Sequence, residues 1–373
     1  MTNKHAFRTR TTERTVAVAS FFSFFVLVGA LSVTLATNCA LAKKHDTGGI
    51  TTRSRDAGSL TALAHVHLAK SGIGFDDLLY APALGRLLAP AANAGYLALI
   101  EPSSRAITRF AAPEYAPKAY GGGHDEGMTS ADSDGKWVFA ADRTTDTLLT
   151  FSVETARVVS RAVLDGNPDY VRYVAATDEV WVTEPDREQI EIFSVPRARD
   201  AAPKKVATIK VPGGPESLVV DSPRGRAYTH LWKGKTVSIE VTNRQIAATY
   251  SNGCQSSRGI AVDGDANLLF AGCSEGRVTV LDLKQAGKIV AFAPTSPGVD
   301  IIAYNPYLHH IYVPSASNGQ LAVFAVERSG ALRLLGHAQA AAGSHCVASD
   351  ESANIWVCDP ERGELIVFGD TLR

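Results

Sequence analysis

The chain has 373 residues, and its hydrophobic fraction of 45% is ordinary for a globular protein and sufficient for one large core. Residues 1–42 hold four Lys or Arg and one Glu, so the rest carries 33 basic and 37 acidic side chains, a net charge of −4. This balance, without any local run of positive charge, argues against a nucleic-acid partner, because binding phosphates requires a basic surface.

The first 42 residues are predicted to be a secretory signal peptide. A basic segment that ends at Arg14 precedes the apolar stretch 16–36, and Ala40-Leu41-Ala42 fits a small-x-small cleavage site. Because about 20 apolar residues can also span a bilayer, an uncleaved N-terminal membrane anchor is the alternative. Both interpretations predict a periplasmic or secreted bacterial protein with no other membrane association. Residues 43–58 are polar and are predicted to be a flexible linker.

Residues 59–373 are predicted to form an all-β domain, a seven-bladed β-propeller with four-stranded blades. Seven times, a turn-forming cluster precedes a short apolar strand, a polar gap and a second strand. The residues that open the first strand of each pair lie 41 to 50 positions apart, which is the length of one four-stranded blade. They are Arg86, Lys136, Glu179, Arg226, Asn267, His309 and Asn354.

The fifth repeat contains all four strands of a blade. Its apolar segments are 259–262, 268–270, 278–281 and 289–292, and the first two gaps between them are rich in Gly, Asp and Ser, which favour turns. No part of the chain after the leader has a sustained helical period. A β-sandwich would not explain one module repeated seven times.

The two ends of the repeat region complement each other. The seventh repeat stops after its third strand, residues 365–368, and an alternating segment, residues 63–68, precedes the first repeat. A missing outer strand would leave a long unpaired edge. We therefore predict that the N-terminal segment joins the last blade and closes the ring.

The repeat also resembles that of a known family. The strings Gly-Ile-Ala-Val-Asp at 259–263, Leu-Phe-Ala at 269–271, Gly-x-Val-x-Val-x-Asp at 276–282 and Ile-Val-Ala at 289–291 resemble the YVTN repeat. The chain after its leader is similar to YncE-like seven-bladed propellers of bacteria. This resemblance implies the fold but no activity, since similar repeats occur in surface-layer proteins, lactonase-like enzymes and propellers without an established function.

Four cysteines follow the leader and are predicted to form two disulfides. An even number of cysteines in an exported chain favours disulfides. Cys346 and Cys358 flank the hairpin turn of the last repeat, and Cys254 and Cys273 flank the equivalent turn of the fifth. Four buried free thiols are the alternative. A zinc site is less favoured, because CxxC and HxxxH spacings are absent.

The propeller geometry selects the candidate binding residues. Loops between consecutive blades, and loops between the second and third strands of a blade, surround the channel on one face, where ligands collect. The polar residues that these loops contain include Asp76, Asp142-Arg143 and Asp300. The predicted ligand-binding residues are His124, Glu126, Tyr170, Arg172, Glu216, His230, Trp232, Arg258 and His345.

Two kinds of chemistry are open to these residues. Three histidines, His124, His230 and His345, come from separate blades and with a nearby Glu are candidates for a cation site or an acid–base pair. The alternative is that they are solvated turn residues, and we predict neither a metal nor a cofactor.

The two arginines have a similar pair of interpretations. Arg172 and Arg258 are candidates for binding a carboxylate or phosphate, and they can instead pair with Asp169 and Glu216. Trp232 is the aromatic candidate for a ligand platform.

The sequence thus predicts an exported propeller that binds a small ligand, or a protein or peptide partner, on its channel face. Two alternatives are a lactonase-like or other hydrolase with a polar or metal-assisted site in the channel, and a passive cell-envelope structural module. The haem-attachment, GxSxG and P-loop motifs are absent, and an enzyme is less favoured than a binding protein.

Overall fold

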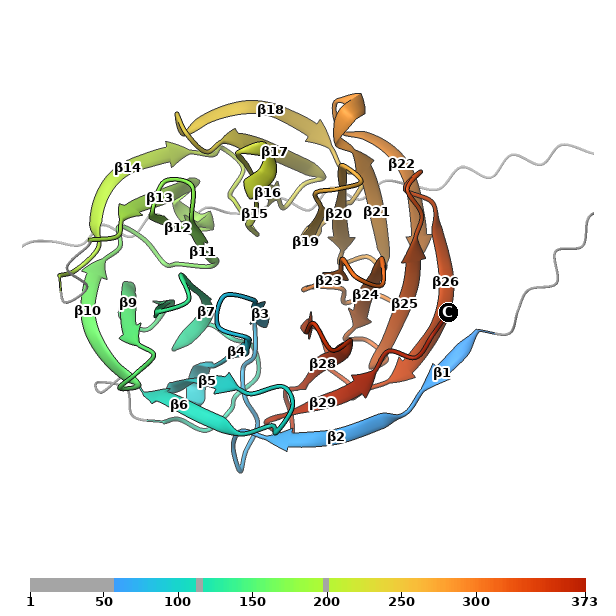
Figure 1. The fold of residues 1–373 in the computed structure, drawn as a ribbon, viewed down its shortest axis with the longest axis horizontal. Coiled ribbons are helices and arrows are strands. Elements are labelled where there is room, and N and C mark those ends of the chain that lie inside the picture. Colours follow the sequence, from blue (N-terminus) through green and yellow to red (C-terminus); the bar gives the residue numbers. More distant parts are fainter. Residues whose placement is uncertain (1–56, 112–116, 197–200) are drawn as a thin grey trace, which may run out of the picture. The chain divides into compact units, whose positions relative to one another are not determined.

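A computed structural model describes residues 57–111, 117–196 and 201–373. These residues form seven sheets arranged as blades around a central channel, with four short 3-10 helices between strands (Figure 1). The predicted all-β, seven-bladed propeller with four-stranded blades is confirmed. The predicted leader (1–42) and most of the predicted linker (43–58) lie outside the described residues.

The first three blades follow the chain, with their strands counted from the channel outward. The first comprises β3 (Leu79–Ala81), β4 (Arg86–Ala91), β5 (Tyr96–Ile100) and β6 (Ile107–Ala111). The second comprises β7 (Met128–Ser133), β8 (Trp137–Asp142), β9 (Thr147–Ser152) and β10 (Arg157–Val163). The third comprises β11 (Val171–Val174), β12 (Glu179–Glu184), β13 (Gln189–Ser194) and β14 (Lys204–Lys210).

The remaining blades repeat this order. The fourth comprises β15 (Val219–Asp221), β16 (Arg226–Leu231), β17 (Lys235–Glu240) and β18 (Gln245–Ser251). The fifth comprises β19 (Ser257–Asp263), β20 (Leu268–Cys273), β21 (Arg277–Asp282) and β22 (Lys288–Pro294). The sixth comprises β23 (Ala303–Asn305), β24 (His310–Ser315), β25 (Gln320–Val326) and β26 (Leu332–Gln339). The seventh contains β27 (Val347–Ser349), β28 (Asn354–Asp359) and β29 (Glu364–Gly369). The 3-10 helices are η1 (Ala92–Ala94), η2 (Pro185–Arg187), η3 (Ser222–Arg224) and η4 (Leu283–Gln285).

A left-handed residue precedes the second strand of every blade. In six blades it is the residue directly before that strand, as with Gly85 (φ 61°), Asp178 (φ 53°) and Asn267 (φ 64°). Gly, Asn and Asp adopt the left-handed conformation most readily. A residue in this conformation lets the chain reverse its direction between the first and second strands of the blade. This shared turn explains why the turn-forming clusters indicated the repeat.

The core lies between neighbouring blades. Each innermost strand contacts the innermost strands on either side, so that β3, β7, β11, β15, β19, β23 and β27 form a closed circle. The second strands are almost entirely buried, and Trp181 of β12 and Trp356 of β28 have no exposed surface. Burying this apolar surface is the main stabilising contribution to the ring.

The ring closes through strands from both ends of the chain. Strand β2 (Ala62–His67) pairs antiparallel with β29, with Val66 opposite Leu365, which confirms the predicted closure. A further strand, β1 (Gly58–Leu60), pairs parallel with β26 as a fifth strand of the sixth blade and was not predicted. A Cβ atom on Gly336 would lie 2.3 Å from the carbonyl oxygen of Gly58, so β1 depends on glycine there.

Both predicted disulfides are present. The Cα atoms are 5.1 Å apart in Cys254–Cys273 and 5.6 Å apart in Cys346–Cys358, within the range that the bridge requires. Each bond ties the segment before an innermost strand to the second strand of the same blade. Two such bonds indicate an oxidising extracellular or periplasmic environment. In the part of the chain that the structure describes, no helix combines the length and apolar character needed to cross a membrane.

Candidate functional site

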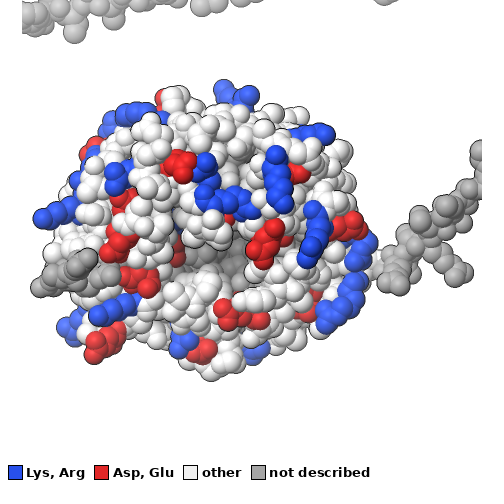
Figure 2. Space-filling view, turned by 45° about the horizontal axis from the view of Figure 1, so that its top comes forward, with Lys and Arg blue, Asp and Glu red and all other residues white. Residues whose placement is uncertain are grey.

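A cavity of about 350 Å³ opens at the mouth of the channel. Its walls come from loops before innermost strands and from loops between second and third strands, the two classes predicted to share a face. Figure 2 shows a hollow at the centre of the ring bordered by acidic and basic side chains. Five predicted ligand-binding residues line the cavity: His124, Tyr170, Glu216, Trp232 and Arg258.

One wall of the cavity is a network of buried ion pairs from three blades. Arg143 follows β8, and its guanidinium forms an ion pair with Asp169 and lies 3.3 Å from Asp76 Oδ2. Its Nη1 also donates to the carbonyl oxygen of His124 at 2.9 Å. The Nδ1 atom of His124 lies 3.2 Å from Asp76 Oδ2. Arg143 therefore fixes the positions of three neighbouring side chains.

The contact between Asp76 and His124 lowers the pKa of the carboxyl group and raises the pKa of the imidazole. The Asp76 carboxylate raises the pKa of His124 to about 9, although burial opposes this shift. Burial alone would raise the pKa of Asp76, but His124 and Arg143 outweigh it and lower that pKa to about 2. An opposite charge nearby favours the charged form of each partner, whereas the guanidinium of Arg143, with Nη1 2.8 Å from His124 Nδ1, opposes the charged imidazole.

The contact predicts a pH-dependent contribution of His124 to stability. The folded pKa lies above the unfolded value of about 6.5, so the contribution is complete below pH 6.5 and is lost as pH rises through about 9. We expect His124→Gln to lower the free energy of unfolding by about 2–3 kcal/mol at pH 6 and by much less at pH 9.5. Urea unfolding at both pH values measures this. In an Asp76→Asn background the effect of the same substitution should vary much less with pH, because Asp76 is the main cause of the raised pKa of His124.

The opposite wall carries a second ion pair beside an aromatic ring. Arg258 of β19 pairs with Glu216, one of the two arrangements expected from the sequence. The guanidinium carbon of Arg258 lies 5.7 Å from the centre of the Trp232 ring, and Trp232 is 43% exposed. Burial and the neighbouring Asp169 raise the pKa of Glu216 to about 8 against the effect of Arg258. Burial likewise raises the pKa of Asp169 to about 7.

Asp300 and His345 complete the mouth. Asp300 lines the cavity, is partly exposed and, unlike Asp76, Asp169 and Glu216, has no ion pair within 4 Å among the described residues. The rings of His124 and His345 stack with their centres 5.8 Å apart. Ligand atoms of His124, Asp300 and His345 lie within 4.8 Å of one another, near enough to hold a cation. Both ring nitrogens of His345, however, contact carbonyl oxygens, of Gly343 at 2.7 Å and Phe75 at 2.9 Å.

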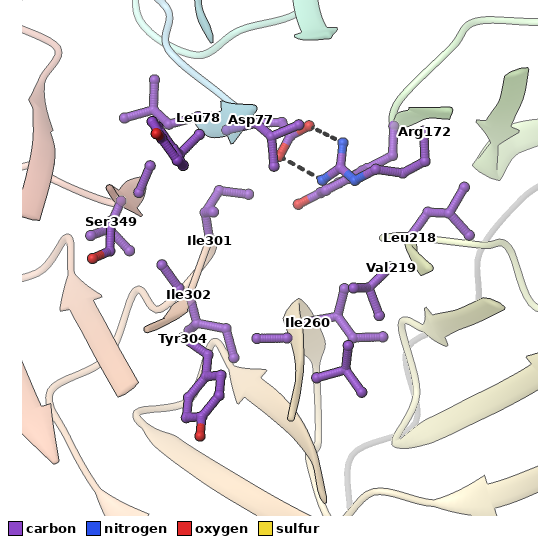
Figure 3. Close-up of a pocket in the computed structure, with 18 residues that line it drawn as sticks. Asp77, Leu78, Arg172, Leu218, Val219, Ile260, Ile301, Ile302, Tyr304 and Ser349 are labelled. Carbon is purple, nitrogen blue, oxygen red and sulfur yellow. Dashed lines mark hydrogen bonds and ion pairs between the residues drawn. The ribbon is translucent and has the colours of Figure 1, made fainter. Parts of the chain in front are cut away.

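Below the mouth, the channel narrows into an apolar cavity of about 220 Å³. Figure 3 shows its side chains converging from the innermost strands and from the residues just before them, with Ile260 of β19 and with Leu218 and Ile301, which precede β15 and β23. Its only buried ion pair among the drawn residues joins Arg172 and Asp77. Tyr170 lines both cavities, and burial raises its pKa well above the usual value.

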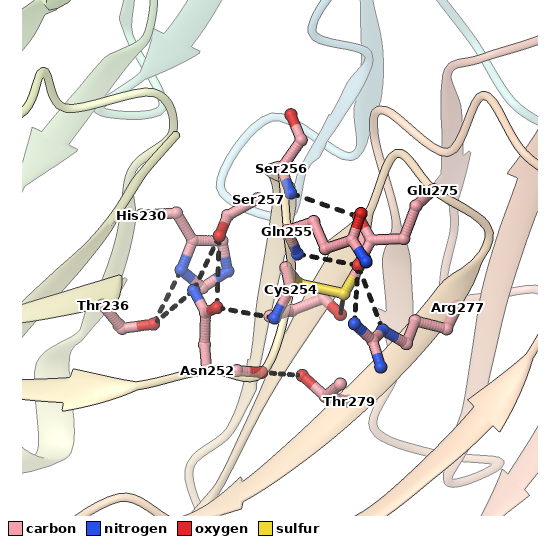
Figure 4. The surroundings of a disulfide bond; sticks show 12 residues. His230, Thr236, Asn252, Cys254, Gln255, Ser256, Ser257, Glu275, Arg277 and Thr279 are labelled. Atoms are coloured by element: carbon pink, nitrogen blue, oxygen red, sulfur yellow. Dashed lines mark hydrogen bonds and ion pairs between the residues drawn. A yellow bond between two sulfur atoms is a disulfide. The ribbon is translucent and has the colours of Figure 1, made fainter. Parts of the chain in front are cut away.

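Three predicted site residues lie elsewhere than expected. His230 was expected at the mouth, but β16 extends to Leu231, and His230 is fully buried with Nδ1 2.9 Å from the Thr236 hydroxyl (Figure 4). Burial lowers its pKa to about 3, so it is neutral. Arg172 pairs with Asp77 in the lower cavity and not with Asp169.

Glu126 is separated from the main cavity. It lines an adjoining recess together with Gly121-Gly122-Gly123 and His124, and it forms an ion pair with Lys118. That the nine predicted residues bind a ligand stays a prediction.

Four further residues at the mouth were identified in the sequence as polar loop residues but are not among the nine predicted ligand-binding residues. Asp76, Arg143, Asp169 and Asp300 all lie in the loop classes that the propeller directs to this face. Their position was therefore visible in the sequence, but their mutual contacts were not. Arg143 in particular connects residues 19 to 67 positions away along the chain.

Comparisons with known proteins support the fold. No protein-family model and no curated protein matches the chain. Hydrazine synthase of Kuenenia stuttgartiensis is similar in structure, with a TM-score of 0.67 and 11% identity over 83% of this chain and 99% of that chain. A chain of the mitotic checkpoint complex has a TM-score of 0.67 and 12% identity over 92% and 99%. At these identities the likeness shows the seven-bladed propeller alone, and the YVTN-repeat, YncE-like assignment stays a prediction.

Proposed function

We propose that the protein is an exported, YncE-like binding module whose channel mouth takes a cationic group of a small ligand or peptide. The observation that carries this proposal is the charge of the cavity. Two arginines and one histidine face six carboxyl groups there. The acids are Asp76, Asp125, Asp169, Asp186, Glu216 and Asp300.

The electrostatics of the buried acids support a cationic ligand. The pKa values of Asp169 and Glu216 are raised even though each has an arginine partner. Burial and mutual repulsion therefore exceed what the protein's own cations neutralise. A ligand ammonium or guanidinium group would add positive charge among these acids, and Asp300, which has no ion pair of its own among the described residues, is the carboxylate that it would contact. The exposed ring of Trp232 offers a further favourable contact, because cations are attracted to indole faces.

The predicted location agrees with this role. Both disulfides suit an oxidising compartment, and the predicted leader would direct the chain to the periplasm or out of the cell. The disulfides also hold the segments that contribute Arg258 and His345 to the mouth. A rigid mouth reduces the ordering cost of binding.

Calorimetric titration with spermidine tests the proposal, with glutarate as an anionic probe. We expect spermidine to bind and glutarate not to bind. Asp300→Asn should weaken spermidine binding about tenfold, which corresponds to about 1.4 kcal/mol. Glu327→Gln, at an exposed acid outside the mouth, is the matched control and should leave the affinity unchanged. Preferential binding of glutarate, or equal affinity in Asp300→Asn and wild type, would refute a cationic ligand.

One observation favours a hydrolase as the second candidate. Burial and Asp169 raise the pKa of Glu216 to about 8, toward the range that a general acid needs, while its ion pair with Arg258 acts in the opposite direction. Turnover of a panel of lactones and esters that Glu216→Gln abolishes would favour this activity over simple binding.

A further inference from the structure

We propose that the ligand of the channel mouth is an amphiphilic cation, an ammonium group with an unbranched hydrocarbon chain, and that the chain occupies the apolar cavity below the mouth. This inference rests on the proposed function, because it names the class of the cationic ligand. It adds a second cavity, of about 220 Å³, that the ammonium group alone would leave unused.

The same chain segments build both cavities. Asp300 lines the mouth, and the next residue, Ile301, lines the apolar cavity. Glu216 at the mouth has the same relation to Leu218, two residues further along. Tyr170 borders both cavities. Because the Cα atoms of consecutive residues are only about 3.8 Å apart, a chain of a few carbons extends from the carboxylates to the apolar side chains.

The wall of the lower cavity is apolar and held in place by the ring. Leu218, Ile260 and Ile301 are buried, and Figure 3 shows the lining side chains around an open centre. Small-molecule sites are mostly apolar, with a few polar groups that fix the orientation of the ligand. A hydrocarbon chain in this cavity would leave water without requiring the wall to rearrange, which favours binding.

The charged groups in this wall already have partners. Asp77 accepts hydrogen bonds from Arg172 at 2.6 and 2.9 Å and from the Ser130 hydroxyl at 2.6 Å. The guanidinium carbon of Arg172 also lies 5.1 Å from the centre of the Tyr170 ring. A second ammonium group of the ligand would lose its water there and meet a carboxylate that is already paired, which is unfavourable. The lower cavity therefore suits a hydrocarbon chain better than a second charge.

A series of alkylammonium ions, titrated into the full chain and followed by nuclear magnetic resonance, tests the chain. Ethyl-, butyl- and hexylammonium share one head group and differ only in the length of the chain. Burying a methylene group contributes up to about fourfold in affinity. We therefore expect hexylammonium to bind at least tenfold more tightly than ethylammonium. Hexanol and hexanoate, which have a similar chain without a cation, should bind at least tenfold more weakly than hexylammonium.

Two variants separate the head group from the chain. Asp300→Asn should weaken all three ammonium ions by the same factor of about ten. Val219 of β15 lines the apolar cavity and is partly buried. Val219→Phe should lower the affinity for hexylammonium at least tenfold more than that for ethylammonium. Val163→Phe, the same replacement at a 78% exposed position of β10, is the matched control and should leave every affinity unchanged.

The outcomes distinguish this inference from the proposed function. Equal affinity for ethyl- and hexylammonium would overturn the chain site and leave the cationic site standing. Hexanol or hexanoate binding as tightly as hexylammonium would refute the cationic head group, and no binding of any ammonium ion would refute both. In the wild type, the terminal methyl group of bound hexylammonium should show nuclear Overhauser effects to Ile260 and Ile301. Their absence would contradict the proposal even if Val219→Phe fails to fold.

Discussion

Replacing Arg172 with Met is expected to lower the free energy of unfolding by about 3–5 kcal/mol, because it leaves a buried carboxylate without its partner. Nη1 and Nη2 of Arg172 donate to the two carboxylate oxygens of Asp77 at 2.6 and 2.9 Å. Their side chains are only 11% and 3% exposed. The pair joins the first and third blades across the channel wall. Urea unfolding followed by circular dichroism measures the loss.

Two controls separate the buried charge from the lost contact. The double variant Asp77→Leu/Arg172→Met contains no isolated charge and should recover much of the stability. Arg226→Met breaks a similar pair with Glu240 in which both side chains are about 30% exposed, and should cost about 1 kcal/mol or less. A loss in Arg172→Met no larger than in Arg226→Met would show that burial does not strengthen the effect of the Asp77 pair.

The substitution Gly363→Ala should lower the free energy of unfolding by about 2–4 kcal/mol, through left-handed strain and steric overlap. Gly363 has φ +62°, and a Cβ atom there would lie 2.2 Å from the carbonyl oxygen of Ser71. Its own carbonyl accepts hydrogen bonds from the backbone N–H groups of Leu68 and Ala69 at 2.9 and 3.1 Å. The substitution thus separates the segment after β2 from the turn before β29. Thermal and urea unfolding measure the effect.

Gly85 provides a matched control for this experiment. Its φ of +61° is nearly the same, but a Cβ atom added there would meet nothing within 4 Å beyond its chain neighbours. Gly85→Ala therefore isolates the left-handed strain, about 1–2 kcal/mol. Equal losses in the two variants would mean that the close approach at Gly363 contributes nothing.

The ring was predictable because its determinants are local. Each blade repeats a left-handed turn residue, such as Gly85 or Asn267, next to a short apolar strand, and these appear directly in the sequence. The pairing of β2 with β29 was predictable because the last repeat lacks a fourth strand and one extra strand precedes the first repeat. Strand β1 could not be found in this way, since three residues at the end of a polar segment show no alternation. Its pairing depends on the missing side chain of Gly336, more than 270 residues away.

The location of the cavity at the channel mouth was predictable from the sequence, but the contacts among its side chains were not. Loop position brought His124 and Glu216 to one cavity, because the scaffold fixes where such loops lie. The predicted position of His230 was wrong because β16 continues to Leu231. His230 therefore lies inside a strand and not in the loop that follows it. Side chains alternate sides along a strand, so an error of one or two residues in a strand boundary decides burial. The partners of Arg143 and Arg172 depend on side chains from other blades, which no local pattern encodes.

The pairing of His65 with Glu364 spans 299 positions of the chain and determines the order in which the ring can be completed. During synthesis, β2 emerges among the first strands and β29 is the last to follow. The first five blades consist of neighbouring segments alone, whereas the sixth includes the distant strand β1 and the seventh takes its outer strand, β2, from the other end of the chain. The ring therefore cannot close before β29 has been made, and until then the two ends of the repeat region each present an unpaired strand edge.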